Sequence, residues 1–276
     1  MRTRHARLGL VVLILAMGTS GLVHAQFRGF RGLEILGGGS GFAPAEFPDR
    51  KFALCRLAYR QGRRFAGGWR TDYPLGERNL SIRFSELTRT RVSMGADRSP
   101  NHYVVRLTDD QLFQCPILMA GDIGSIDINP EEALRLRAYL LKGGFLWTDD
   151  MWGPDQWAAW TRELAKVLDP AEYPIEDVPI SDPVFQGQFI VERMPQIPNI
   201  QHWRSSGTTS EQGAASAVPV FRAVRDREGR IMVAMMHNTD IADAFEREGE
   251  DPDYFYNFSP TGYALGVNIL LYALTH

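Results

Sequence analysis

The chain has 276 residues, of which 44% are hydrophobic, and its 30 Lys and Arg against 33 Asp and Glu give a formal net charge of −3. This length suits one large domain, or one domain with short additions. A mildly acidic balance argues against nucleic acid or an anionic membrane surface as the main partner, because both attract basic proteins.

The N-terminus has the pattern of a secretory signal peptide. Three arginines within the first seven residues precede a short apolar run, Leu8 to Met17, and Ala25 is a small residue suited to cleavage. The apolar run is shorter than the about 20 residues that a spanning helix needs, which disfavours a membrane anchor. We therefore predict a signal peptide over residues 1–25 and a periplasmic or secreted protein with no membrane span after cleavage.

The segment after the predicted cleavage site is rich in glycine. Residues 26–50 contain six glycines and are expected to form a flexible leader. Loss of the signal arginines leaves 27 basic against 33 acidic residues, so the mature net charge is −6. A single α/β domain is expected over residues 51–276. Its first elements are predicted to be a strand over 52–59, a loop over 67–74, a helix over about 79–91 and a strand over 102–110.

Two apolar runs that end in acidic residues, with a well-marked helix between them, are the most informative part of the sequence. The runs are CPILMAGD at 115–122 and GGFLWTDD at 143–150. Between them, Asn129 can cap a helix, Pro130 suits its first position and Glu132 completes a capping box. A strand, a helix and a strand in this order predict a parallel βαβ unit.

The rest of the chain continues the alternation of strands and helices. A helix is expected from Pro154, followed by irregular structure over 169–200 and a surface loop over 205–217. Residues 220–240 resemble a hairpin with its turn at 226–229, and residues 261–276 form a final apolar helix. This order predicts an α/β sandwich with a mostly parallel sheet and antiparallel strands at one edge.

The predicted sheet indicates where a functional site lies. Open parallel sheets bind ligands in the crevice beyond the carboxyl ends of their strands, which is where Asp122, Asp149 and Asp150 are expected. Asp149 and Asp150 are the first catalytic candidates, as a general base, metal ligand or hydroxyl acceptor. The alternative is that they cap the helix that begins near Pro154.

Other candidates follow neighbouring strands. His237 comes after the apolar strand IMVAMM and is the third catalytic candidate, because His exchanges protons near neutral pH. The alternatives for this segment are a hydrogen-bonded strand end or a metal site with Asp240 and Asp243. No HxxxH or HxH spacing supports a metal, so we expect no metal and no cofactor. The ligand-binding candidates besides Asp122 are Asp72, Tyr73, Trp152, Asn238 and Asp240.

The chain has two cysteines, Cys55 and Cys115, both in apolar runs that are typical of strands. Neither has a neighbouring His that would indicate an activated thiolate. An exported protein can oxidise such a pair to a disulfide. The alternative, which we favour, is two buried free cysteines, because Cys packs as a small hydrophobic residue.

Several segments resemble the domain of unknown function 4159 family. They are WRTDYP at 69–74, LRAYLLKGGFLWTDD at 136–150, SDPVF at 181–185, MPQIPNI at 194–200, HNTDIADAFEREGED at 237–251 and GVNILLYALTH at 266–276. The resemblance covers about residues 52–276. It implies the class I glutamine amidotransferase-like fold, a flavodoxin-like three-layer sandwich, in an exported or membrane-associated setting, and it implies no reaction.

One departure from the wider fold bears on activity. True amidotransferases hold a nucleophilic Cys on a tight turn after a central strand, with a His–Glu pair. The comparable strand end here reads Thr148-Asp149-Asp150-Met151 and has no Cys. We therefore expect no glutamine amidotransferase activity.

Three functional hypotheses follow. The leading one is an exported accessory protein that binds a partner, with an envelope protein, a small molecule or a glycan as candidates. The second is a hydrolase, with glycans as candidate substrates, that uses Asp149 or Asp150 as base and His237 as acid. The third is a structural component of an envelope complex. A hydrolase needs these side chains to converge on one small volume, whereas a scaffold needs an exposed apolar patch.

Overall fold

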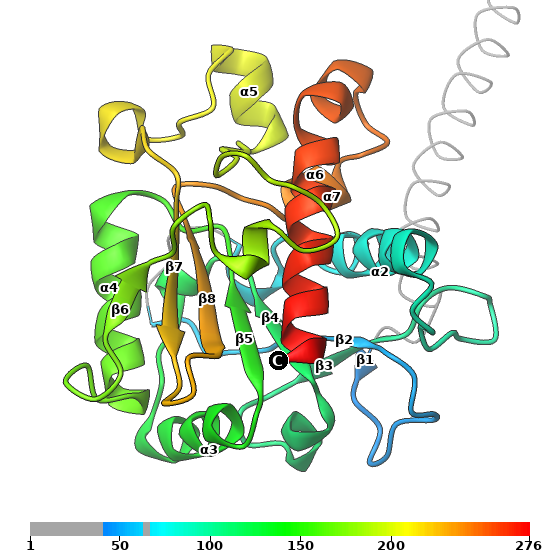
Figure 1. Cartoon of the computed structure of the whole chain (residues 1–276), viewed down its shortest axis with the longest axis vertical. Helices are drawn as coiled ribbons and strands as arrows, with labels where there is room; N and C mark the ends of the chain where they lie inside the picture. The colour runs from blue at the N-terminus through cyan, green and yellow to red at the C-terminus, as the bar shows by residue number, and fades with distance from the viewer. Residues whose placement is uncertain (1–40, 63–66) are drawn as a thin grey trace, which may run out of the picture.

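The computed structural model describes residues 41–62 and 67–276 (Figure 1), so the predicted signal peptide, its cleavage site and residues 26–40 of the predicted leader lie outside the described residues. The described chain forms one eight-stranded sheet in the order β1-β3-β2-β4-β5-β8-β7-β6. The strands are β1 (Gly41–Phe42), β2 (Leu54–Leu57), β3 (His102–Val105), β4 (Ile117–Ala120), β5 (Phe145–Thr148), β6 (Ile175–Asp177), β7 (Val220–Arg225) and β8 (Ile231–His237).

Helices connect and cover these strands. They are α2 (Leu75–Thr88), α3 (Pro130–Leu141), α4 (Gly153–Val167), α5 (Ile200–Ser206), α6 (Asp243–Glu246) and α7 (Pro252–Thr275). Short 3-10 turns add η1 (Gly68–Arg70), η2 (Asp110–Gln114), η3 (Ile123–Ser125), η4 (Pro183–Phe185) and η5 (Gly213–Ser216).

The sheet is mostly parallel, as the alternation of elements predicted. The strands from β1 across to β8 run parallel, and β7 and β6 continue the sheet in antiparallel pairing. The predicted hairpin is confirmed, since Val220 of β7 lies opposite His237 of β8. Its second strand is parallel to β5, with Val233 opposite Leu146. The hairpin therefore joins the parallel part of the sheet to its antiparallel edge.

The predicted βαβ unit is present as β4, α3 and β5. The Asn129 side chain accepts a hydrogen bond from the Glu132 amide at 3.0 Å, and the Glu132 carboxylate accepts one from the Asn129 amide at 2.9 Å. This capping box satisfies backbone donors that the first turn of a helix leaves free. The helix ends before Gly143, whose φ of +103° suits glycine. Local sequence signals thus set both ends of α3.

Each face of the sheet carries its own hydrophobic core. Phe145 and Trp147 of β5 pack into the cluster covered by α2, α6 and α7, whereas Leu146 between them packs into the cluster covered by α3 and α4. Successive side chains of a strand point to opposite faces. Since both faces are covered, the central strand β4 is apolar and buried along its whole length. Figure 1 shows α7 lying lengthwise against one of these faces.

Two helices begin earlier than their sequence patterns suggested. α2 begins at Leu75 rather than near residue 79, directly after the loop that carries Asp72. α7 begins at Pro252 rather than 261 and continues through Pro260. Asp251 explains this start, because its side chain accepts hydrogen bonds from the amides of residues 253 and 254. The predicted irregular stretch 169–200 also contributes β6, an edge strand.

The final part of the predicted leader lies against the sheet. β1 pairs with β3 in parallel, and the Ala43 amide donates to the Val104 carbonyl at 2.9 Å. The Phe47 ring lies 4.2 Å from the Tyr103 ring, measured between centroids. Residues 41–47 therefore extend the edge of the sheet beside β3.

The two cysteines form a disulfide, so the expectation of free buried cysteines was wrong. Cys55 lies in β2, and Cys115 lies just before the neighbouring strand β4, with 5.9 Å between their Cα atoms. That separation falls within the range that a disulfide requires. The 60 residues between them in sequence concealed the contact, which exists only because β2 and β4 are neighbours.

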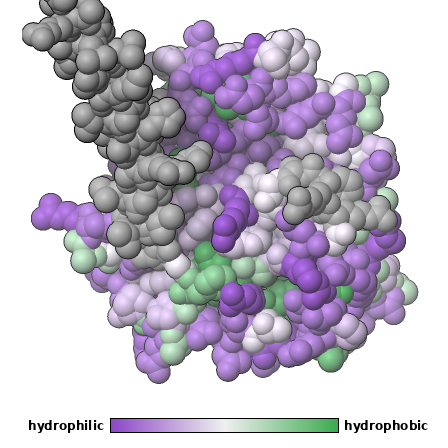
Figure 2. All heavy atoms as spheres, turned by 180° about the vertical axis from the view of Figure 1, so that it is seen from behind, coloured by the Kyte–Doolittle hydropathy of each residue, from purple (hydrophilic) through white to green (hydrophobic). Residues whose placement is uncertain are grey.

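The surface is mainly hydrophilic on the face that Figure 2 shows. This face is turned away from the view of Figure 1, and hydrophobic side chains gather in its lower half. Strongly exposed hydrophobic side chains include Leu134 of α3 and Tyr256 of α7. These two helices cover opposite faces of the sheet, so these two exposed side chains do not form one patch. Among the described residues, no helix combines the length and apolar character needed to cross a bilayer.

Candidate functional site

Acidic residues gather where the parallel strands β2, β4, β5 and β8 end. We call this region the acidic edge and define it by Asp72, Asp122, Asp149, Asp150, Asp240 and Asp243. Asp72 lies on the loop between β2 and α2, and the others come shortly after β4, β5 and β8, with Asp243 as the first residue of α6. Because these strands are parallel, their carboxyl ends meet at one edge, as the sequence predicted for Asp122, Asp149 and Asp150.

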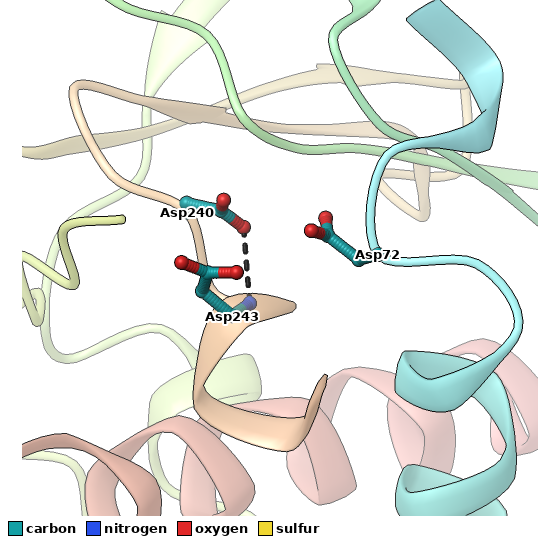
Figure 3. Close-up of side chains that lie close together, drawn as sticks. All are labelled: Asp72, Asp240 and Asp243. Atoms are coloured by element: carbon teal, nitrogen blue, oxygen red, sulfur yellow. Dashed lines mark hydrogen bonds between the residues drawn. The ribbon is translucent and has the colours of Figure 1, made fainter. Parts of the chain in front are cut away.

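Three carboxylates meet within the acidic edge, and we call them the aspartate triad: Asp72, Asp240 and Asp243. Each offers one oxygen atom, and these oxygens all lie within 4.8 Å of one another. Figure 3 shows the Asp72 side chain pointing toward the other two from a separate segment of chain. The Asp243 amide donates to Asp240 Oδ1 at 3.1 Å. The triad therefore joins the β2–α2 loop to the segment that follows β8.

Burial and mutual repulsion raise the pKa of each triad carboxyl. Burial is the largest cause for Asp72 and Asp240, and the charge of Asp243 adds to it in both cases, so both pKa values lie well above the usual range. Burial also raises the pKa of Asp243 to about 7, although Arg247 opposes the change. Either protons or a bound cation must offset this concentration of negative charge.

Two arginines lie beside the triad, but each also forms an ion pair with a carboxylate outside the triad. Arg56 is fully buried and pairs with Glu77, which is also fully buried. Its positive charge lowers the pKa of Asp72, whereas its Nη1 and Nη2 atoms have no hydrogen-bond partner. Arg247 lies 3.5 Å from Asp243 Oδ1 and also contacts Glu246 at 2.9 Å and another glutamate. The acidic edge thus keeps an excess of negative charge.

Asp149 has a positioning role in the structure. Its Oδ1 accepts a hydrogen bond from the Ile241 amide at 3.1 Å, and its Oδ2 accepts one from the Ala242 amide at 2.8 Å. Burial raises its pKa to about 6, and these backbone hydrogen bonds oppose the rise. Asp149 therefore fixes the short segment between Asp240 and Asp243 to the end of β5.

Asp150 and Asp122 each come shortly after a strand, and each has a left-handed backbone conformation. Asp150 has a φ of +53° and Asp122 a φ of +46°. Asp150 is half-buried, and its Oδ1 accepts a hydrogen bond from Trp152 Nε1 at 3.0 Å. Burial and then the charge of Asp122 raise its pKa well above the usual range. Asp122 Oδ2 accepts a hydrogen bond from the Gly68 amide at 2.7 Å, which ties η1 to the end of β4.

His237 makes its contacts with α4 and β7. Its ring lies 5.0 Å from the Trp157 ring, and its Nε2 is 3.1 Å from the Gly153 carbonyl. Arg222 Nη1 donates to Nδ1 at 2.7 Å, so Nδ1 is unprotonated and Nε2 carries the hydrogen. Burial, reinforced by Arg222, lowers the pKa of His237 and so disfavours the charged form of the ring. These contacts engage both ring nitrogens. Within the part of the chain that the structure describes, none of the hydrogen-bond partners of the His237 ring is shared with the side chain of Asp149 or Asp150.

The remaining candidates have structural partners. Asn238 Oδ1 accepts from the Gly153 amide at 2.8 Å, and its Nδ2 donates to the Val218 carbonyl at 2.8 Å. The Tyr73 hydroxyl lies 3.0 Å from His102 Nδ1. Trp152 is buried and contacts Asp150 as described. Of the predicted ligand-binding residues, Asp72 and Asp240 are the two whose carboxylates converge.

Sequence reasoning missed Arg56 and Glu77 and considered Asp243 only beside His237. A signal for Arg56 was present, because it interrupts the apolar run FALCRLAY. A charged residue inside a buried strand needs a partner. Its partner, Glu77, lies 21 residues later in α2, and no local pattern connects the two.

A surface cavity lies at the other end of the strands. It has a volume of about 1210 Å³ and is lined by residues that precede β2 and β4, by Thr90 and Arg91 after α2, and by Leu274 near the end of α7. Its lining includes several charged side chains that reach solvent. The acidic edge is the stronger candidate site, because buried charged groups are costly and cluster where proteins bind or react.

Comparison with known proteins gives a family but no activity. The model of the family described as Domain of unknown function (DUF4159) matches residues 53–274. No curated protein matches the chain.

Proposed function

The chain belongs to this DUF4159 family of unknown function, and from that premise we propose that it is an exported accessory protein that binds a positively charged ligand at the acidic edge. The observation that carries the proposal is the convergence of Asp72, Asp240 and Asp243 in a buried region. A cationic ligand would stabilise their charged forms, which burial alone disfavours.

Backbone conformation supports the acidic edge as a binding surface. Asp72, Asp122, Asp150 and Asn238 all have positive φ values, between +46° and +63°, and all lie where strands or their loops reach this edge. Asp and Asn adopt this conformation more readily than other residues with side chains. Backbone conformations of this kind cluster at functional sites, where the surrounding structure holds them.

The finer fold assignment is part of the same proposal. Helices on both faces of a mostly parallel sheet suit a flavodoxin-like three-layer sandwich of the class I glutamine amidotransferase-like kind. Amidotransferase activity is not part of it, because both cysteines of the chain are joined in the disulfide. Neither thiol is then free to act as a nucleophile.

The contacts of the catalytic candidates favour binding over hydrolysis. Asp149 uses both carboxylate oxygens to hold backbone amides, and both ring nitrogens of His237 are engaged. A general base and acid need free positions near one reacting group. We therefore place Asp149 and His237 in supporting roles.

Thermal unfolding of the exported chain tests the proposal. The probes are CaCl₂, MgCl₂, lysine, arginine and spermidine, with neutral oligosaccharides for comparison. We expect at least one cation to raise the Tm, because a ligand that binds only the folded state stabilises it. Asp72→Asn should remove the increase, whereas Asp110→Asn should retain it, since Asp110 is 94% exposed and pairs with Arg135. Stabilisation by neutral oligosaccharides alone, or by none of the probes, would reject the proposal.

A further inference from the structure

We propose that the aspartate triad binds one divalent cation through carboxylate oxygens, and that Ca²⁺ is the preferred ion. This inference rests on the proposed function, because it names the chemical class of the cation bound at the acidic edge. It goes beyond that function by assigning three specific ligands, Asp72, Asp240 and Asp243.

The spacing of the triad oxygens suits a single ion. The three atoms lie within 4.8 Å of one another. Ca²⁺ binds oxygen at about 2.3–2.6 Å, so ligands on opposite sides of the ion are about 5 Å apart. Mg²⁺ binds at about 2.0–2.1 Å in a rigid octahedron. Separations of up to 4.8 Å admit either ion, but Ca²⁺ tolerates irregular geometry and therefore needs less movement of the chain than Mg²⁺.

Asp72 provides an observation independent of the clustering itself. Its side chain is 6% exposed, and its Oδ2 has no hydrogen-bond partner among the described residues. A buried carboxylate oxygen without a partner is costly, and such groups in folded proteins indicate a missing ligand or water. Figure 3 shows this carboxylate pointing toward Asp240 and Asp243, so a cation among the three would satisfy it.

The other two aspartates each keep an oxygen for an ion. Asp240 Oδ1 accepts from the Asp243 amide, and Asp243 Oδ2 accepts from the Ile200 amide at 3.2 Å. Asp243 Oδ1 lies 3.5 Å from Arg247 Nε without forming a hydrogen bond. These backbone contacts orient the carboxylates before an ion arrives. Water can complete the six to eight ligands that Ca²⁺ takes.

The chemistry of the ligands favours a hard ion. Every member of the triad is a carboxylate, and both cysteines are joined in a disulfide away from it. The histidine candidate from the sequence, His237, uses both ring nitrogens elsewhere. Zn²⁺ prefers nitrogen and sulfur ligands, whereas carboxylates suit Ca²⁺ and Mg²⁺. The arrangement therefore predicts selection of Ca²⁺ over Zn²⁺.

Calorimetric titration of the EDTA-treated exported chain with CaCl₂ at pH 7.5 tests the inference. We expect one Ca²⁺ per chain with a Kd of about 1 mM or tighter, the range of extracellular calcium modules. Asp72→Asn preserves shape but removes charge, and it should weaken binding at least about tenfold, because a charged ligand becomes an amide. Asp110→Asn, whose exposed side chain lies outside the acidic edge, should bind as the unaltered chain does.

The outcomes separate this inference from the proposed function. Stabilisation by spermidine or arginine without Ca²⁺ binding would overturn the inference and leave the proposed function standing. Ca²⁺ binding that persists in Asp72→Asn would also overturn it, because the ion would then bind elsewhere. If circular dichroism shows that Asp72→Asn is unfolded, Asp240→Asn takes its place with the same expectation. Absence of Ca²⁺ binding to the unaltered chain rejects the inference without any variant.

Discussion

Arg56 and Glu77 form an ion pair in which neither side chain has any solvent exposure. Arg56 lies in β2 and Glu77 in the first turn of α2, so the pair connects the sheet to the helix that follows the Asp72 loop. Gly121 permits this arrangement, because a Cβ atom there would lie 2.9 Å from Arg56 Nη1. The pair therefore holds together the strand and the helix that flank the Asp72 loop of the acidic edge.

Removal of the Glu77 charge should destabilise the fold strongly. Glu77→Gln leaves the buried guanidinium of Arg56 without its carboxylate, and such losses cost about 3–5 kcal/mol. Urea denaturation measures the change. Glu86→Gln is the matched control, because Glu86 pairs with Arg83 at the surface, where an ion pair contributes about 1 kcal/mol or less. Equal effects of the two substitutions would contradict this account.

Truncation of Asp149 should weaken the segment that carries Asp240 and Asp243. Asp149→Ala leaves the amides of Ile241 and Ala242 without acceptors. Each buried donor left unsatisfied costs about 1–3 kcal/mol. We expect a comparable loss in the free energy of unfolding, together with weaker Ca²⁺ binding, and a smaller loss for Asp149→Asn, which retains one oxygen. Unchanged stability of Asp149→Ala would contradict the positioning role.

Without cations, stability should decrease as the pH rises from 6.5 to 7.5, through the pKa of Asp243. Burial raises the pKa of Asp243 to about 7 and those of Asp72 and Asp240 well above the usual range. The folded chain then holds protons that the unfolded chain has released, so raising the pH favours unfolding by about 1.4 kcal/mol per pH unit for each proton retained. His237 acts in the opposite direction, but only below about pH 6.5, because its pKa is lowered.

Urea denaturation in EDTA at several pH values measures this slope. Asp72→Asn should flatten it, because the substitution removes one titrating carboxyl and lessens the repulsion on Asp240. Asp110→Asn serves as the control and should leave the slope unchanged. A stability that rises steadily across the same interval would show that the triad does not retain protons.

Loss of the disulfide should cost several kcal/mol. The bond between Cys55 and Cys115 closes a loop with a sequence separation of 60, for which the chain-entropy relation gives about 4 kcal/mol. A Cys55→Ala/Cys115→Ala double variant should therefore show a lower denaturation midpoint. The reagent dithiothreitol should lower the midpoint of the unaltered chain and not that of the variant. Two thiols titrating in the untreated, unfolded protein would contradict the bond.

Local signals in the sequence predicted much of the fold. Asn129 and Glu132 set the start of α3 through contacts three residues apart, and the turn near residues 226–229 set the hairpin. The sequence reading recognised neither Asp251 nor the loop before Leu75 as the signal for a helix start. It therefore placed the starts of α7 and α2 too late in the chain. The predicted final helix began at residue 261, just after Pro260, whereas α7 accommodates this proline in its interior.

The candidate site was predictable in position but not in composition. The rule for parallel sheets predicted Asp122, Asp149 and Asp150 beyond the carboxyl ends of the strands, and they do follow β4 and β5 in the structure. It gave no means of knowing that Asp149 would turn toward backbone amides, or that Asp72 would face Asp240. Those orientations depend on the packing of α6 and α2 beside each other, which brings together segments far apart in the chain.

The attachment of Ile241 and Ala242 to Asp149 divides the triad into two unequal parts. Asp240 and Asp243 flank a segment already anchored to β5, whereas Asp72 reaches them from a loop with a different anchor, the contact between Gly68 and Asp122. Binding of a cation to the triad should therefore restrict backbone motion mainly in the segment that carries Asp72. Amide hydrogen exchange should slow in residues 67–74 and change little after β8, so that one short segment reports on the site.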